Sequence, residues 1–214
     1  MNVELNSIYK KLYAHFGPQS WWPGETPFEV IIGAILTQNT NWLNVERAIS
    51  NLKKNRLLSP YKLYRLPQKR LAPLIKSAGY YNIKAKRLKE FLGFFFKVYK
   101  GSIKKISSID TQDLRRQLLC VNGIGPETAD SILLYALGKP IFVVDAYTKR
   151  MLLRHRLIKE DAGYDATQGL FMRNIKPDVK LFNEYHALLV KLGKEFCLKN
   201  NPRCEICPLK SKKL

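Results

Sequence analysis

The chain has 214 residues, and its 37 lysine and arginine residues against 17 aspartate and glutamate residues give a formal net charge of +20 at pH 7. This length suits one compact unit or two small lobes with a substantial core. Hydrophobic residues make up 46% and charged residues 25% of the chain, which is typical of a globular protein and excludes a disordered one. The longest apolar runs, such as 30–36, are too short to span a bilayer, and the N-terminal residues include no apolar signal-peptide core. We therefore expect a cytoplasmic protein close to the nucleoid.

The excess of positive charge indicates an anionic partner, either nucleic acid or a membrane surface. Basic residues are spread along the chain, with short clusters at 84–87, 104–105 and 210–213. The alternative is a basic surface that is simply well solvated. Charge alone names no reaction.

Hydrophobic residues recur at helical spacing along most of the chain, and strand-like alternation is scarce. The stripes are Phe28, Ile31, Ile32, Ile35 and Leu36, then Leu88, Phe91, Leu92, Phe95 and Phe96, then Ile132, Leu133 and Leu137, and finally Leu188, Leu189, Leu192 and Phe196. Proline and glycine separate these stripes. The pattern predicts roughly ten helices and an all-α protein, with a short extended link at 141–144.

The segment 108–150 has the most informative local pattern. A helix of about 110–120 is followed by V-N-G-I-G at 121–125, and Pro126 starts a second helix that Gly138 ends. Gly123 and Gly125 flank an apolar residue, so they form a tight turn and leave backbone N–H groups bare for a phosphate oxygen. The alternative is an ordinary turn between helices. A dinucleotide fingerprint is excluded because helix, not strand, precedes the glycines.

Asp145 lies some twenty residues after this turn, at the start of the helix A-Y-T-K-R. It can be the N-cap of that helix, and it can also be a functional carboxylate. The two roles are compatible, because the helix dipole keeps a carboxylate at this position ionised.

Together, L-L-C-V-N-G-I-G-P-E-T-A-D and V-V-D-A-Y-T-K-R resemble the helix–hairpin–helix (HhH), Gly/Pro-rich loop and aspartate of the endonuclease III-like HhH-GPD superfamily of DNA glycosylases. I-L-T-Q-N-T at 35–40 resembles the segment with which that family invades the duplex, and G-Y-Y-N-I-K-A at 79–85 resembles its second DNA-contacting loop. The resemblance covers roughly 28–207.

The resemblance implies a two-lobed, all-α fold. One lobe is expected at 20–139, with the hairpin at about 110–138, and the other at 1–19 with 140–214. Double-stranded DNA carrying a damaged base or an abasic site would bind a monomer across the cleft between the lobes, with Asp145 at its floor and no membrane involved.

The implied reaction flips a damaged nucleotide out of the stack and cleaves its N-glycosidic bond. Asp145 would stabilise the positive charge on the sugar and orient or deprotonate the attacking water. The implied DNA contacts are Gln38, Asn39, Tyr80, Tyr81, Asn122, Gly123, Gly125 and Thr128. Gln38 with Asn39 would fill the hole left by the flipped base, and Tyr80 and Tyr81 would wedge from the other strand or simply pack.

Glu127 separates two reaction types. Members of the family that also cut the strand carry a lysine there, whose amine attacks the sugar. Glu127 therefore favours a monofunctional glycosylase, although Lys149, one turn past Asp145, could substitute for that lysine. The alternatives are a bifunctional glycosylase/lyase on oxidised pyrimidines and a non-catalytic DNA-binding protein.

The candidates for a base pocket are Trp21, Trp22, Trp42 and Glu127, with ordinary packing as the alternative for the tryptophans. Electron-rich indoles stack well on a cationic alkylated purine. W-W-P, L-T-Q-N-T and Glu127 together resemble the 3-methyladenine glycosylase branch of the family, in which the alkylated base is already a good leaving group.

Cys197, Cys204 and Cys207 resemble the [4Fe–4S] loop of the same family, but Lys213 stands at the position of its fourth cysteine. A cubane cluster normally binds four thiolates. The alternatives are a cluster or zinc ion with an outside ligand, and a remnant of a lost cluster. Cys120 lies near the hairpin and is typical of a small buried residue.

Overall fold

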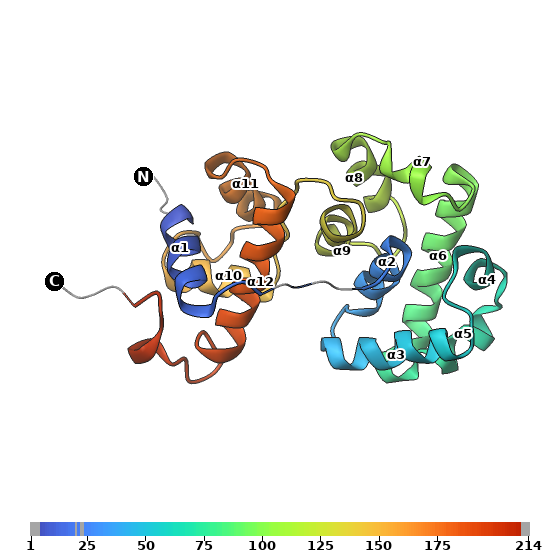
Figure 1. Cartoon of the computed structure of the whole chain (residues 1–214), viewed down its shortest axis with the longest axis horizontal. Helices are drawn as coiled ribbons and strands as arrows, with labels where there is room; N and C mark the ends of the chain where they lie inside the picture. Colours follow the sequence, from blue (N-terminus) through green and yellow to red (C-terminus); the bar gives the residue numbers. More distant parts are fainter. Residues whose placement is uncertain (1–4, 20, 22–23, 211–214) are drawn as a thin grey trace. The chain divides into compact units, whose positions relative to one another are not determined.

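The computed structural model describes residues 5–19, 21 and 24–210, and these residues form helices and no strand. Its backbone divides into two compact units, residues 1–21 with 140–214 and residues 22–139. The regular elements in the described part of both units are all helices, so the prediction of an all-α protein is confirmed (Figure 1). Twelve α-helices are found in the described part of the chain, somewhat more than the hydrophobic stripes predict, because α4, α5 and α7 are too short to show a stripe. None of the described helices is long and apolar enough to cross a membrane.

The unit that contains both termini is built around α12. Its elements are α1 (Leu5–Phe16), α10 (Ala146–Arg154), α11 (Tyr164–Asn174), α12 (Val179–Glu195) and the 3₁₀ turn η3 (Cys204–Ile206). α12 packs against α10 and α1. Phe142 stacks on Phe171 with ring centroids 3.7 Å apart, and Tyr185 meets both rings edge-on. The Tyr185 hydroxyl donates to the Leu5 carbonyl at 2.9 Å, so the chain's first described helix is tied into this core.

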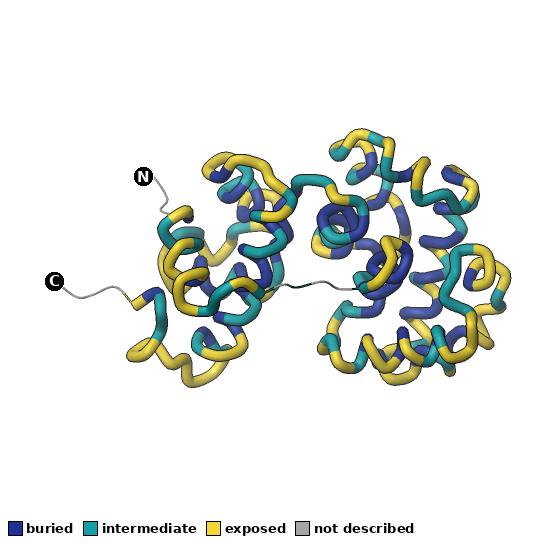
Figure 2. The backbone as a smooth tube through the Cα atoms, in the orientation of Figure 1, coloured by how far each residue is buried: buried dark blue, intermediate teal, exposed yellow. Residues whose placement is uncertain are grey.

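The other unit is built around α2. Its elements are α2 (Pro27–Leu36), α3 (Trp42–Lys54), α4 (Pro60–Arg65), α5 (Gln68–Leu74), the 3₁₀ turn η1 (Lys76–Ala78), α6 (Tyr81–Tyr99), α7 (Ile103–Ser107), α8 (Thr111–Leu119), α9 (Pro126–Ser131) and the π-helical turn η2 (Ile132–Ala136). α2 is buried along most of its length and contacts α3, α6, α9 and η2 (Figure 2). Thr26 caps it by accepting a hydrogen bond from the Glu29 N–H at 3.2 Å. The end of α2 is thereby held beside the hairpin.

The hairpin helices form as predicted at their ends. Asp110 caps α8 by accepting from the Gln112 and Asp113 N–H groups, Pro126 is the first residue of α9, and Gly138 has φ +61°. The interior differs, because after Ser131 the helix widens into the π-helical turn η2. A π-turn shifts the side chains that follow it, and no local sequence signal marks it.

Candidate active site and DNA-binding elements

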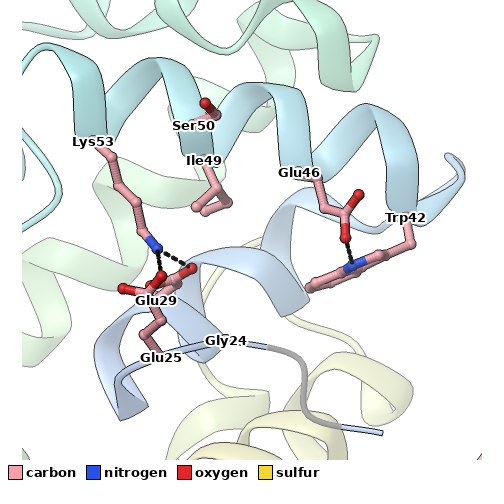
Figure 3. Close-up of a pocket in the computed structure, with 8 residues that line it drawn as sticks. All are labelled: Gly24, Glu25, Glu29, Trp42, Glu46, Ile49, Ser50 and Lys53. Carbon is pink, nitrogen blue, oxygen red and sulfur yellow. Dashed lines mark hydrogen bonds and ion pairs between the residues drawn. The ribbon is translucent and has the colours of Figure 1, made fainter.

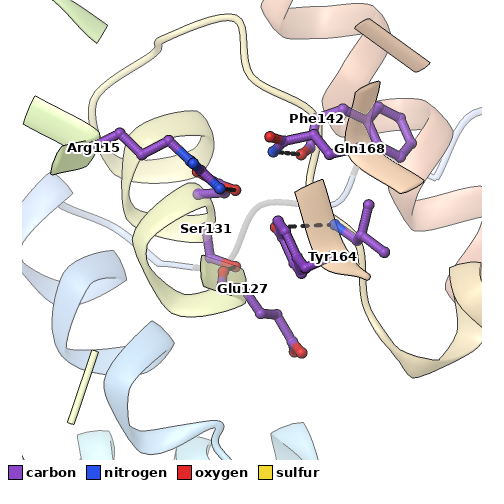
Figure 4. A network of polar contacts seen from close by, with 8 residues as sticks. Arg115, Glu127, Ser131, Phe142, Tyr164 and Gln168 are labelled. Carbon is purple, nitrogen blue, oxygen red and sulfur yellow. Dashed lines mark hydrogen bonds and ion pairs between the residues drawn. The ribbon is translucent and has the colours of Figure 1, made fainter. Parts of the chain in front are cut away.

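Asp145 stands at the junction between an extended, buried link and α10. The link is held by its neighbours, because the Gln168 side chain donates to the Phe142 carbonyl at 2.6 Å and the Val144 N–H donates to the Tyr164 hydroxyl at 3.3 Å (Figure 4). Asp145 is the N-cap of α10, and its Oδ1 accepts from the Thr148 N–H at 2.7 Å. The carboxylate therefore has a fixed position at a helix N-terminus.

The second oxygen of this carboxylate faces a histidine from α12. His186 Nε2 lies 3.4 Å from Asp145 Oδ2, and the Asp145 side chain is only 12% exposed. Burial raises the pKa of Asp145, but the nearby His186 and the Thr148 N–H hydrogen bond outweigh burial, and the pKa lies below its usual value. Asp145 is therefore ionised at neutral pH, as a charge-stabilising carboxylate must be.

The two hairpin glycines have different surroundings. Gly123 has φ +87°, and a Cβ there would lie 2.4 Å from Cγ of Arg87. Gly125 has φ −91°, and a Cβ there would meet nothing within 4 Å. Gly123 is thus required by the fold, whereas the bare backbone at Gly125 is exposed and free for a close approach from outside. Asn122 beside them is exposed as well.

Gln38 joins the turn after α2 to the hairpin. Its Nε2 donates to the Gly123 carbonyl and to the Thr128 hydroxyl, each at 2.9 Å, and its Oε1 accepts from Arg87. Thr128 is buried, so its side chain could contact DNA directly only after the residues that cover it had moved. Asn39, the next residue, is exposed with φ +53°. Of the predicted hole-filling pair, Asn39 is at the tip and Gln38 is bound to the protein.

The loop before α6 presents Tyr80. Gly79 has φ +70° and Tyr80 has φ +44°, and the Tyr80 side chain is 69% exposed. Lys84 holds this loop from inside, because its Nζ donates to the Ala78 carbonyl at 2.6 Å while the residue is 1% exposed. Burial, together with nearby Arg87, lowers the pKa of Lys84 to about 8. Tyr81 is the first residue of α6 and is half-buried, so of the predicted wedge residues Tyr80 is the one that projects.

Trp42 lines a hollow of about 410 Å³ between α3 and the start of α2 (Figure 3). Its indole N–H donates to Glu46 at 2.7 Å, and its ring packs over Gly33, where a Cβ would lie 3.3 Å away. Glu25 and Glu29 line the same hollow, and both are ion-paired with Lys53 at 2.9 Å. The lining holds three carboxylates against one ammonium group, which is unusual in so basic a chain.

The other predicted pocket residues are Trp21, Trp22 and Glu127. Trp21 belongs to the unit with both termini, where its ring stacks on His186, and Trp22 lies outside the described residues. Glu127 is exposed in the first turn of α9, and in Figure 4 its carboxylate points away from that helix. Lys149 is half-buried in the first turns of α10.

The cysteine segment offers an incomplete ligand set. Cys197 is buried and its Sγ accepts from Arg154 at 3.2 Å, Cys204 is exposed, and Cys207 is half-buried. Burial, with the two neighbouring cysteines, raises the pKa of the Cys207 thiol. In the described ranges no group of three or more His, Cys, Asp or Glu side chains is arranged to hold a metal ion, and Lys213 lies outside those ranges. Three thiols do not make a four-thiolate site, so the [4Fe–4S] cluster stays a prediction for iron analysis.

Two functional candidates were missed from the sequence. His186 is the one imidazole in the buried run from Tyr185 to Leu189, and a polar residue in an apolar stripe is a signal that could have found it. Arg87 belongs to a basic cluster and carries no signal, because its role depends on a glycine far along the chain.

Comparisons with known proteins identify the family of this chain. Residues 32–177 match the profile described as HhH-GPD superfamily base excision DNA repair protein. A protein of Methanocaldococcus jannaschii, named provisionally as a DNA repair glycosylase, is 50% identical over 96% of this chain and 94% of its own length. Endonuclease III of Thermotoga maritima is 29% identical over 86% of this chain and 81% of its own.

Solved structures show the same fold. The 3-methyladenine DNA glycosylase MagIII of H. pylori, bound to 1,N6-ethenoadenine, has a TM-score of 0.77 at 29% identity and covers 89% of this chain and 97% of its own. A trapped endonuclease III–DNA covalent intermediate has a TM-score of 0.82 at 20% identity, over 98% and 93% of the two chains. The chain belongs to the HhH-GPD superfamily of base excision repair proteins and is a DNA glycosylase with the all-α fold of that superfamily.

Proposed function

We propose that this DNA glycosylase is monofunctional and removes an alkylated purine such as 3-methyladenine. The observation that carries the proposal is Glu127, which is exposed in the first turn of α9 where the strand-cutting members of the family carry a lysine. A carboxylate cannot form a Schiff base with the sugar. The bond is then cleaved by water and the strand stays intact.

Asp145 is the proposed catalytic carboxylate. As the glycosidic bond breaks, positive charge builds on the sugar, and a fixed, ionised carboxylate stabilises that charge more strongly than mobile water does. Asp145 meets both conditions through its N-cap position and its lowered pKa. It is also suited to orient or deprotonate the attacking water.

The hollow at Trp42 supports a cationic base as the substrate. An indole face attracts a cation, and the carboxylates of Glu46 and Glu29 favour a positively charged ring over a neutral one. The relative from H. pylori, whose name gives 3-methyladenine and whose structure holds 1,N6-ethenoadenine, is consistent with a modified purine. Trp21 and Trp22 remain proposed pocket residues.

DNA binding is assigned to the exposed tips. Gly125 and Asn122 would meet a phosphate, Tyr80 would wedge into the stack, and Asn39 would enter the hole behind the flipped base. Gln38 would hold Asn39 at that place through its bonds to the hairpin. The lysine and arginine side chains that give the net charge of +20 would attract the duplex phosphates.

The test is base release from DNA methylated with a radiolabel, with thymine glycol and uracil duplexes in parallel. Release of 3-methyladenine, with strand breaks only after alkali, supports the proposal. Asp145→Asn should abolish release while duplex binding is kept. Trp42→Ala should lower release more than binding of undamaged DNA, and Trp42→Phe, which keeps an aromatic face, is its matched control.

The other outcomes decide between the rivals. Strand breaks without alkali, together with a borohydride-trapped adduct that Lys149→Ala removes, would establish a glycosylase/lyase. No product from any duplex would establish a DNA-binding protein. Equal losses of release and binding in Trp42→Ala would refute the pocket.

A further inference from the structure

His186 is a buried imidazole that the proposed reaction leaves unused. The residue is 4% exposed on α12, and its Nε2 lies 3.4 Å from Asp145 Oδ2. The Trp21 ring stacks on the imidazole, with centroids 5.5 Å apart and planes 16° apart. A polar side chain this deeply buried is expensive unless it is paired, so its place beside the carboxylate calls for a reason.

The packing of α10 on α12 holds the two side chains together. A Cβ at Gly193 would lie 2.3 Å from Cδ1 of Tyr147, so only glycine lets the helices approach this closely. Arg150 ties the same pair, because its guanidinium donates to the carbonyls of Cys197 at 2.7 Å and Gly193 at 3.0 Å. His186 lies two helical turns before Gly193 on the same side of α12, and its contact with Asp145 places it at the N-cap of α10.

The Asp145 carboxylate consequently has a neighbour at each of its oxygens. The Thr148 N–H donates to Oδ1, and His186 faces Oδ2. The Trp21 ring stacks on the face of the imidazole and limits its movement. We propose that His186 is a positioning residue that fixes the orientation of the Asp145 carboxylate for bond cleavage, with Trp21 as its support. The inference rests on the proposed function of Asp145 and deepens it.

The pair also bears on the ionisation of Asp145. Removing the imidazole would leave burial, which raises the pKa of Asp145, opposed only by the bonds of Thr148. Several ionisable groups of the adjoining elements have partners of their own: Arg150 donates to the carbonyls of Gly193 and Cys197, Glu184 accepts from the Gln19 N–H, and the Tyr164 hydroxyl accepts from the Val144 N–H. Lys149 is a further charged residue in the first turns of α10, and it is unchanged in the variants below.

The experiment measures single-turnover release of 3-methyladenine from methylated DNA against pH for three variants. His186→Leu should lower the rate about 10- to 100-fold at neutral pH, because a misplaced catalytic group costs that much. Its rate should also begin to fall at a higher pH than in the parent, since Asp145 then protonates more easily. His186→Gln, which keeps a donor near Oδ2, should recover much of the rate while its acidic limb still moves upward.

Binding of an abasic-site analogue and thermal unfolding complete the design. Unchanged binding and a folded His186→Leu support the inference, and if that variant does not fold, the pH profile of His186→Gln decides it. An unmoved acidic limb, or a rate equal to the parent's, overturns the inference. Asp145→Asn distinguishes a failure of the proposed function from a failure of this inference. An active Asp145→Asn variant refutes the proposed function of Asp145. An inactive Asp145→Asn variant, together with His186 variants that keep the parental rate and pH profile, refutes only the role of His186.

Discussion

Gly123→Ala should lower the thermal stability of the protein, whereas Gly125→Ala should not. Gly123 has φ +87°, and a Cβ there would lie 2.4 Å from Cγ, 2.9 Å from Cδ and 3.0 Å from Nε of Arg87. The first of these atoms belongs to the stem of the side chain, so the whole arginine would have to move. Arg87 would then lose its hydrogen bond to Gln38, which in turn holds the Gly123 carbonyl.

The magnitude follows from these two terms. An L-residue forced into left-handed backbone costs about 1–2 kcal/mol. Loss of a hydrogen bond from a charged donor costs about 1.5–3 kcal/mol. Their sum is about 2.5–5 kcal/mol, which for a chain of this size lowers Tm by about 5–20 °C.

Thermal unfolding followed by circular dichroism measures the effect, with Gly125→Ala as the matched control. Gly125→Ala should keep or raise Tm, since alanine at a compatible position stabilises by about 0.4–1 kcal/mol. The same variant should weaken duplex binding if the backbone there approaches a phosphate. A Gly123→Ala protein with the parental Tm would refute the reasoning, because neither the strain nor the displaced arginine would then exist.

Three further outcomes are expected. Asp130 is fully buried, and Arg115 binds both of its oxygens, at 2.8 and 3.2 Å, so Asp130→Ala should cost about 3–5 kcal/mol in urea unfolding. A loss below about 1 kcal/mol would contradict this. The pKa of Lys84 is lowered from 10.5 to about 8, so the unfolded chain binds its proton more tightly, and the free energy of unfolding should rise with pH between those values. Lys84→Met should remove that rise, and a variant whose stability depends on pH as the parent's does would contradict this assignment to Lys84. Duplex affinity should fall about 10³- to 10⁵-fold between 50 and 200 mM salt if six to ten phosphates are contacted, and a flat salt profile would leave the basic surface without this role.

The sequence predicts features that are local. Asp110 and Asp145 are N-caps and Pro126 opens α9, because each choice depends only on the next few residues. The hydrophobic stripes likewise lie in the core, apart from the half-buried Phe96, Leu137 and Phe196, since a buried helix face repeats within its own length.

Features that depend on distant pairs could not be predicted. Gln38 meets the hairpin 85–90 residues further on, and His186 meets Asp145 across two helices. Such contacts depend on how the helices pack against one another, and local patterns in one sequence do not show which distant residues will meet. The π-helical turn that follows Ser131 packs against α2, and no local sequence signal marks it.

In the catalytic role proposed for Asp145, its lowered pKa has a use in the complex with DNA. A duplex brings negative phosphates toward any carboxylate that acts on its sugar. At about 6 Å and an effective dielectric constant of about 20, one phosphate disfavours the ionised carboxylate by about 3 kcal/mol, or about two pKa units. A carboxylate of ordinary pKa in a buried site would then approach protonation near neutral pH. The N-cap of α10 and His186 offset that repulsion before DNA arrives. The pair therefore matters most in the complex, where Asp145 has to stay ionised beside a polyanion.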